Sequence, residues 1–176
     1  MRRATRLIAL LVALAGCGGS GSAATTTTAA QTAFCRGAQL TGRFAVVYGS
    51  AGAGNIVYRL ALRNQSAQTC TVSGLPRVRL LTRGGAALPT HVTPARPGTG
   101  AAALIRLAPG AKATATARFS PDVPGVGEPV AGTRCERVAS RLRVFAPGGG
   151  STIVPIVPPT SVCEHGGLQF SLYRRA

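Results

Sequence analysis

Apolar and polar residues alternate along several short segments of the chain. In residues 55–64, NIVYRLALRN, the apolar Ile56, Tyr58, Leu60 and Leu62 fall on one side and the residues between them on the other. A period of two residues is typical of a strand with one buried face. This segment therefore predicts a β-strand that packs against a core.

The same two-residue period recurs along the rest of the chain. Clear examples are residues 77–82, 111–120, 141–146 and 168–173, and weaker ones lie near Phe44, Leu88, Leu104 and Ile153. Turns rich in Gly and Pro separate these segments, and no segment shows a sustained 3.6-residue apolar period. We therefore expect an all-β domain, an immunoglobulin-like antiparallel β-sandwich of about seven to nine strands, with little helix.

The first residues have the pattern of an export signal. Arg2, Arg3 and Arg6 precede residues 7–15, which are all Leu, Ile, Val or Ala. At about 1.5 Å per residue, this apolar run is too short to cross roughly 30 Å of hydrocarbon. A basic start followed by a short apolar core predicts a signal peptide that is removed on export.

The end of the apolar run, LAGC, resembles the lipobox of bacterial lipoproteins. The resemblance implies that Cys17 receives a diacylglyceryl group and becomes the first residue after cleavage, which places the protein on the extracytoplasmic face of the cell membrane. An ordinary secretory signal is the alternative. We expect a signal peptide in residues 1–16, a flexible Gly/Ser/Ala/Thr tether in residues 17–33 and a folded domain in residues 34–176.

The net positive charge of the chain favours anionic partners. The chain has 20 Lys and Arg against 4 Asp and Glu, and without the three signal arginines 17 basic residues remain, a formal net charge of +13. Such a field attracts anionic surfaces, including phospholipid headgroups and wall polymers. The alternative is compositional, because 19 arginines with one lysine and abundant Ala, Gly and Pro are typical of GC-rich coding.

Four cysteines lie in the expected domain: Cys35, Cys70, Cys135 and Cys163. An even number outside the cytosol favours two disulfides over a zinc site, because no two cysteines have the close spacing of a zinc knuckle. If successive strands reverse direction, all four lie at one end of the sandwich. Since the first and last strands of such folds often run parallel, we prefer the pairs Cys35–Cys163 and Cys70–Cys135 among three permitted connectivities.

Residues 58–88, YRLALRNQSAQTCTVSGLPRVRLLTRGGAAL, resemble the central motif of domain-of-unknown-function family 4232, found in secreted proteins and lipoproteins of actinobacteria. The matching positions are Asn64, Cys70, Thr71, Gly74, Pro76, Val78 and Gly85. The resemblance extends over residues 34–173 and implies a β-sandwich at the cell surface. It implies no catalytic activity.

Residues suited to catalysis are few. The only histidines are His91 and His165, and no GxSxG motif occurs. The acids are Asp122, Glu128, Glu136 and Glu164. His165 follows Cys163 and Glu164, but we interpret it as a solvated loop residue, and we expect no metal and no cofactor. A surface hydrolase with a dispersed active site is the alternative to a non-catalytic protein.

Arginines occupy the polar positions of several predicted strands: Arg59, Arg63, Arg77, Arg79, Arg83, Arg118, Arg141 and Arg143. If these strands are neighbours, their outer faces carry a basic stripe, and arginine suits bidentate binding of oxyanions. A solvated sheet that resists edge pairing is the alternative. We take six of them as candidate anion-binding residues: Arg59, Arg63, Arg77, Arg79, Arg141 and Arg143.

The expected function is therefore that of a non-catalytic binding module of the cell envelope. Candidate partners are anionic wall polymer, lipid headgroups or an envelope protein. Nucleic acid is not expected, because five Phe and three Tyr offer few surfaces on which bases could stack.

Overall fold

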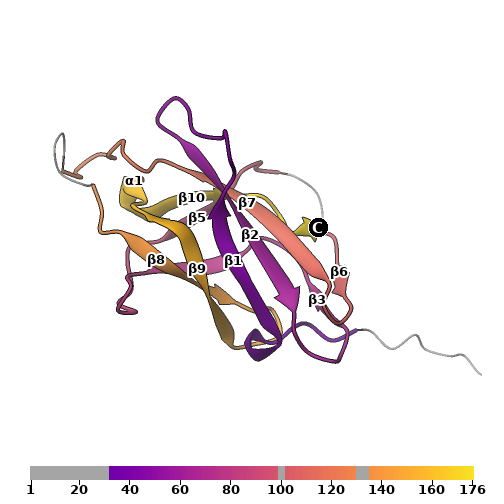
Figure 1. Cartoon of the computed structure of the whole chain (residues 1–176). Coiled ribbons are helices and arrows are strands. Elements are labelled where there is room, and N and C mark those ends of the chain that lie inside the picture. Colours follow the sequence, from indigo (N-terminus) through magenta and orange to yellow (C-terminus); the bar gives the residue numbers. More distant parts are fainter. Residues whose placement is uncertain (1–31, 99–101, 130–134) are drawn as a thin grey trace, which may run out of the picture. The chain divides into compact units, whose positions relative to one another are not determined.

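The computed structural model describes residues 32–98, 102–129 and 135–176 (Figure 1). They belong to one compact unit. The predicted signal peptide, Cys17 and all but the last two residues of the tether lie outside the described residues.

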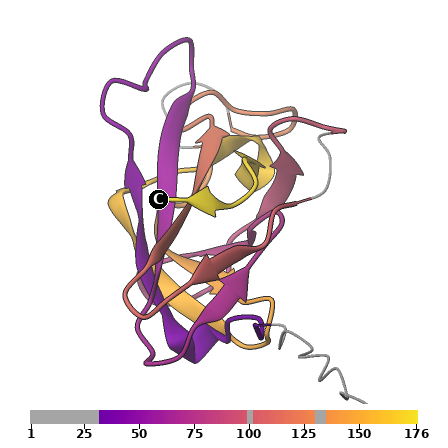
Figure 2. The same cartoon turned by 90° about the vertical axis from the view of Figure 1, so that its right-hand side faces the viewer.

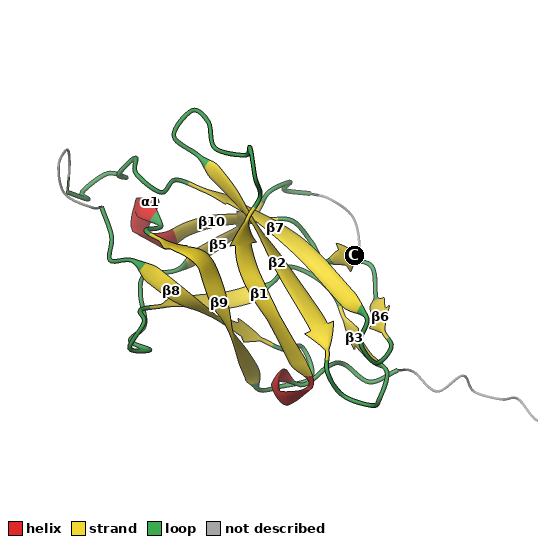
Figure 3. Cartoon of the chain, in the orientation of Figure 1, coloured by secondary structure: helices red, strands yellow, loops and turns green. Residues whose placement is uncertain are grey.

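Strands make up almost all of the regular secondary structure of the described residues, and loops connect them (Figure 3). The strands are β1 (Leu40–Val46), β2 (Ile56–Asn64), β3 (Cys70–Val72), β4 (Arg77–Leu81), β5 (His91–Pro94), β6 (Ile105–Leu107), β7 (Lys112–Phe119), β8 (Ala139–Phe145), β9 (Ser151–Thr160), β10 (Gly167–Phe170) and β11 (Arg174–Arg175). Two short helical segments are η1 (Gly37–Gln39) and α1 (Cys163–Gly166). Each of the nine predicted segments overlaps a strand, so the all-β prediction is confirmed.

Most strands join one sheet, in the order β4-β8-β9-β1-β2-β7-β10-β5, and β11 pairs with β7 beside β10. Figure 1 shows β8, β9, β1, β2 and β7 side by side, and the view turned by 90° in Figure 2 shows early and late segments intermixed. The β1–β9 and β5–β10 pairs are parallel, and the other pairs are antiparallel. The sheet is therefore mixed, whereas we expected an antiparallel sandwich in which only the first and last strands run parallel.

The two ends of this sheet approach each other through residues 88–90. The N–H of Leu88 donates to the carbonyl oxygen of Leu80 at 2.9 Å, and the N–H of Leu80 donates to Oγ1 of Thr90 at 2.9 Å. The chain then continues directly into β5, which pairs with β10 at the far end of the strand order. The sheet is consequently nearly closed around its core.

The alternation seen in the sequence produces this core. Tyr58, Leu60 and Leu62 of β2 are at most 1% exposed, whereas Arg59 and Arg63 on the opposite face of the strand are exposed. Four rings form the centre of the core: Phe44, Tyr58, Phe119 and Phe170, with centroid separations of 5.2 to 6.4 Å between neighbours. Burial of such rings supplies much of the driving force for folding.

The structure has two disulfides, as expected, but the preferred pairing was wrong. The bonds join Cys35 with Cys70 and Cys135 with Cys163. The strand parallel to β1 is β9, which precedes Cys163, and not the last predicted strand, which follows it. Because β1 and β9 run in the same direction, the chain that enters β1 and the chain that leaves β9 lie at opposite ends of the domain. Cys35 and Cys163 are therefore too far apart to pair.

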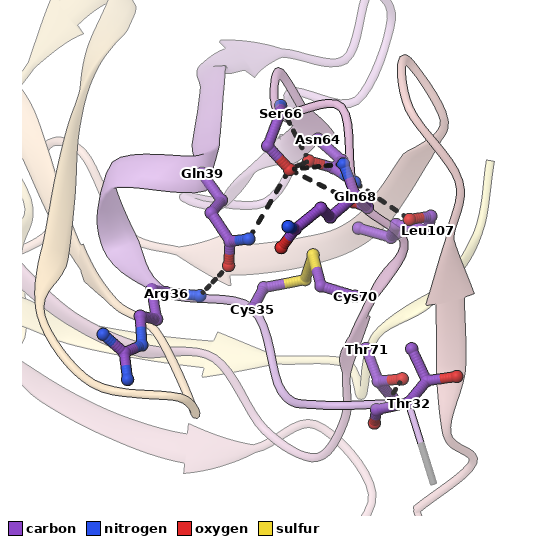
Figure 4. Close-up of a disulfide and its surroundings, with 10 residues drawn as sticks. All are labelled: Thr32, Cys35, Arg36, Gln39, Asn64, Ser66, Gln68, Cys70, Thr71 and Leu107. Atoms are coloured by element: carbon purple, nitrogen blue, oxygen red, sulfur yellow. Dashed lines mark hydrogen bonds between the residues drawn. A yellow bond between two sulfur atoms is a disulfide. The ribbon is translucent and has the colours of Figure 1, made fainter. Parts of the chain in front are cut away.

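Cys35 instead meets Cys70 through a strand that the sequence pattern missed. The backbone N–H of Cys35 donates to the carbonyl oxygen of Thr71 at 2.9 Å, and the N–H of Thr71 donates to the carbonyl oxygen of Ala33 at 2.9 Å. This pairing holds residues 33–35 beside β3, so the two sulfur atoms lie between adjacent segments (Figure 4).

Candidate anion-binding face

The motif around Asn64 is structural. Asn64 is fully buried, and its Nδ2 donates hydrogen bonds to the carbonyl oxygens of Gln68 (2.6 Å) and Leu107 (3.0 Å). Its Oδ1 accepts from the N–H (2.9 Å) and the hydroxyl (2.7 Å) of Ser66 (Figure 4). The side chain thereby closes the turn that leads to Cys70, and all its polar capacity is used within the fold.

The remaining motif positions also serve the backbone or the core. Gly74 and Gly85 have φ of 81° and 87°, a left-handed conformation that favours glycine in turns. Thr71, Pro76 and Val78 are buried. The motif accordingly accounts for the fold and contributes no exposed reactive group.

The candidate arginines of β4 and β8 do come together, because these strands are neighbours. In the antiparallel register Arg79 lies directly opposite Arg143, Arg77 opposite Phe145, and Leu81 opposite Arg141. Directly opposed side chains point to the same face of a sheet, and the alternate residues of both strands are buried in the core. Arg77, Arg79, Arg141 and Arg143 therefore form one outward cluster, which we call the β4–β8 basic face.

In the described part of the chain, no acid neutralises this face. Among the residues that the structure describes, none of its four arginines is within ion-pair distance of a carboxylate. Side chains directly opposite in an antiparallel pair have Cβ atoms about 5 Å apart, and like charges at that separation are destabilising. The Arg79–Arg143 pair therefore carries an unfavourable interaction that an oxyanion placed between the two guanidinium groups would relieve.

Apolar groups flank the arginines. The guanidinium of Arg77 lies 6.0 Å from the ring centroid of Phe145, at the outer limit of a cation–π contact. On the neighbouring strand β9, Ile153 lies opposite Arg143 and is 50% exposed, and Pro155 lies opposite Arg141. The face thus combines fixed positive charge with exposed apolar surface.

Arg59 and Arg63 lie elsewhere. They are on β2, which is separated from β8 by β9 and β1, so the predicted stripe is divided into two groups. Arg59 is flanked by Ala45 and Thr116. Arg63 lies opposite Lys112, and its Nε donates to the carbonyl oxygen of Gly110 at 3.2 Å.

The acid Glu128 supports a turn of the backbone. Glu128 is the only buried one among the described residues, and its side chain is 2% exposed. Its Oε2 accepts hydrogen bonds from the backbone N–H of Gly125 (2.7 Å) and Glu164 (2.8 Å), and its Oε1 accepts one from the N–H of His165. Both Glu164 and His165 have φ of 55°, which L-residues rarely adopt. The carboxylate thus holds the turn that follows Cys163.

Two opposing influences act on this carboxyl group. Burial, the largest single cause, raises the pKa of Glu128, but the backbone donors and the nearby charge of His165 together lower it by more, so that the pKa lies below its ordinary value.

Ligand atoms of Glu128, Glu136 and His165 lie within 4.8 Å of one another, a spacing that suits a metal ion. Because both oxygens of Glu128 already accept backbone hydrogen bonds, we assign this cluster to the support of the turn.

None of the helices in the described ranges has the length and apolar character to cross a bilayer. A family model described as a domain of unknown function (DUF4232) matches residues 35–170. No curated protein and no solved structure matches the chain.

Proposed function

The chain belongs to the DUF4232 family of domains of unknown function, and we propose that it is an exported lipoprotein whose β domain binds anionic material of the cell envelope without catalysis. Cys17 carries the lipid anchor in this proposal, and residues 17–33 are the tether. The finer description of the domain as immunoglobulin-like belongs to the same proposal, supported by its many short strands and Gly/Pro-rich turns.

The observation that carries the binding proposal is the cross-strand Arg79–Arg143 pair, which has no neighbouring acid among the described residues. Two guanidinium groups on directly opposed residues can both donate to one phosphate or carboxylate, and each can do so through two N–H groups. The β2 arginines lack an opposed arginine: Arg59 is flanked by Ala45 and Thr116, and Arg63 lies opposite Lys112 but already donates to the carbonyl oxygen of Gly110. We therefore assign binding to the β4–β8 basic face rather than to β2.

Replacement of Arg77, Arg79, Arg141 and Arg143 by Ser tests this assignment. We expect the quadruple variant to be released from anionic envelope fragments and from vesicles containing phosphatidylglycerol at low salt, because exposed charge attraction is only weakly screened there. A matched control replaces Arg43, Arg59, Arg63 and Arg118, which are exposed on β1, β2 and β7, and removes the same charge. Equal retention of both variants would contradict the proposal.

The anchor is tested separately. Replacement of Cys17 by Ser removes the sulfur that would carry the acyl chains, and we expect the protein to leave the membrane fraction. The hydrolase alternative predicts turnover in a broad ester, amide and glycoside screen that the replacement of His91 or His165 by Ala abolishes.

A further inference from the structure

Strand β9 changes partner along its length. Residues 151–155 pair with β8, Ile156 and Val157 lie opposite Phe44 and Ala45 of β1, and Thr160 returns to Ala139 of β8. One residue of β8 between Ala139 and Arg141 therefore faces four residues of β9 between Pro155 and Thr160. This irregularity separates the two strands locally and opens a hollow on the outer surface of the sheet.

The hollow forms a continuous open groove. One part, of about 950 Å³, is lined by the turn that follows β4 and by the segment that leads into β8, with Pro159 at its edge. A second part, of about 690 Å³, runs on toward Ile153 and Pro155. Both parts share Arg83, Ser140 and Pro159, so they are adjacent sections of a single depression.

Arginine dominates the charge of this groove. Arg83, Arg137 and Arg141 line it and are exposed, whereas Glu136 is the one acid among its described lining residues. Arg141 is also a member of the β4–β8 basic face, so the groove and that face are continuous. Polar hydroxyls of Thr82 and Ser140 lie on the same walls and could donate hydrogen bonds to an oxyanion.

We propose that this groove binds a single extended polyanion chain, with Arg83 and Arg137 holding anionic groups at one end and Arg141 leading the chain onto the β4–β8 basic face. The proposal rests on the binding function proposed above and names its ligand class. A flat bilayer would lie across the depression without following it, whereas a flexible polymer can follow its floor. The apolar Ile153 and Pro155 would contact the polymer backbone between charged groups.

The test compares two double variants in the full-length protein. One replaces Arg83 and Arg137 by Ser, and the control replaces Arg59 and Arg63 by Ser with the same loss of charge. The probes are a short linear polyphosphate, polyglutamate of equal charge number and phosphatidylglycerol vesicles, titrated over a range of salt concentrations. Thermal melts confirm that each variant is folded.

We expect the groove variant to lose about tenfold or more of the affinity for the polymer, and the slope of log affinity against log salt to fall by about 1.5. The control should keep most of its affinity, and vesicle binding should survive in both. Preference for polyphosphate or for polyglutamate identifies the anion. Equal weakening by the two double variants would overturn the groove proposal while leaving the basic face intact. Absence of polymer and vesicle binding by the unaltered protein would overturn both proposals.

Discussion

Arg79 and Arg143 lie directly opposite each other on β4 and β8, with no carboxylate to neutralise either one in the part of the chain that the structure describes. A pair of like charges in this position reduces stability, by analogy with other cross-strand pairs. On the outer surface, the same two guanidinium groups that repel each other attract an oxyanion, and this supports the proposed binding of anions.

The replacement of Arg79 by Glu therefore has opposite effects on stability and on binding. We expect the free energy of unfolding to rise by about 0.2 to 1 kcal/mol, because the new carboxylate would face Arg143. Affinity for anionic polymer should fall in the same variant. Urea unfolding and a binding titration measure the two quantities. Arg59→Glu, between Ala45 and Thr116, is the control, and a stability gain there of the same size would contradict the explanation.

The replacement of Glu128 by Gln should destabilise the domain by about 1 to 3 kcal/mol at neutral pH, since three hydrogen bonds to a charged acceptor are weakened. The pKa of Glu128 is lowered in the folded state, so its contribution is present above the ordinary value of 4.5 and is lost as pH falls through the folded value. Between pH 7 and pH 2, the free energy of unfolding should therefore fall more steeply for the unaltered protein than for the variant. Asp122→Asn, in the same loop, is the control for charge.

The disulfides can be assigned by digestion without reduction. We expect one peptide pair linked through Cys35 and Cys70 and another linked through Cys135 and Cys163. The bonds close loops with sequence separations of 35 and 28 residues, and the chain-entropy relation gives about 4 kcal/mol for each. Replacement of either pair by Ala should lower stability by that order in denaturant titrations. A peptide that joins Cys35 to Cys163 would contradict the structure.

The replacement of Asn64 by Asp should lower the free energy of unfolding strongly, although the two side chains have nearly the same shape. The new carboxylate oxygen would face the carbonyl oxygens of Gln68 and Leu107, where Asn64 now donates two hydrogen bonds. We expect a loss of about 3 kcal/mol or more, because the site is fully buried and offers no replacement donor. Ser66→Ala, which removes only one partner of Oδ1, should cost about 1 kcal/mol, as measured by thermal or urea unfolding.

Alternation along the sequence was sufficient to predict nine of the strands, because most of them have a buried and an exposed face; β5, which has no buried residue, overlaps only the end of its predicted segment. It failed for β3, since Cys70, Thr71 and Val72 are all buried, and for β11, which has only two residues. The missed β3 also misled the disulfide prediction, which assumed regular reversal of strand direction. Pairing of strands distant in sequence, such as β1 with β9, depends on the whole fold and leaves no local signal.

The candidate site was predictable in part. Strand alternation identified Arg77, Arg79, Arg141 and Arg143 as outward-facing, and the β4–β8 pairing confirms that they are neighbours. The sequence could not distinguish these four arginines from Arg59 and Arg63, because the spacing of strands along a chain does not determine their order in the sheet. Arg137 was missed altogether, since it precedes β8 in an irregular segment without a period.

The position of the Cys35–Cys70 bond has a mechanical consequence. The cross-link lies where the leading segment joins the domain, beside the single bridge between Phe34 and Thr71. A force applied to the chain ahead of residue 34 would open that bridge first and would then load the covalent bond at Cys35, which stops further peeling. The domain is thereby built to withstand tension at the end from which a surface tether would pull.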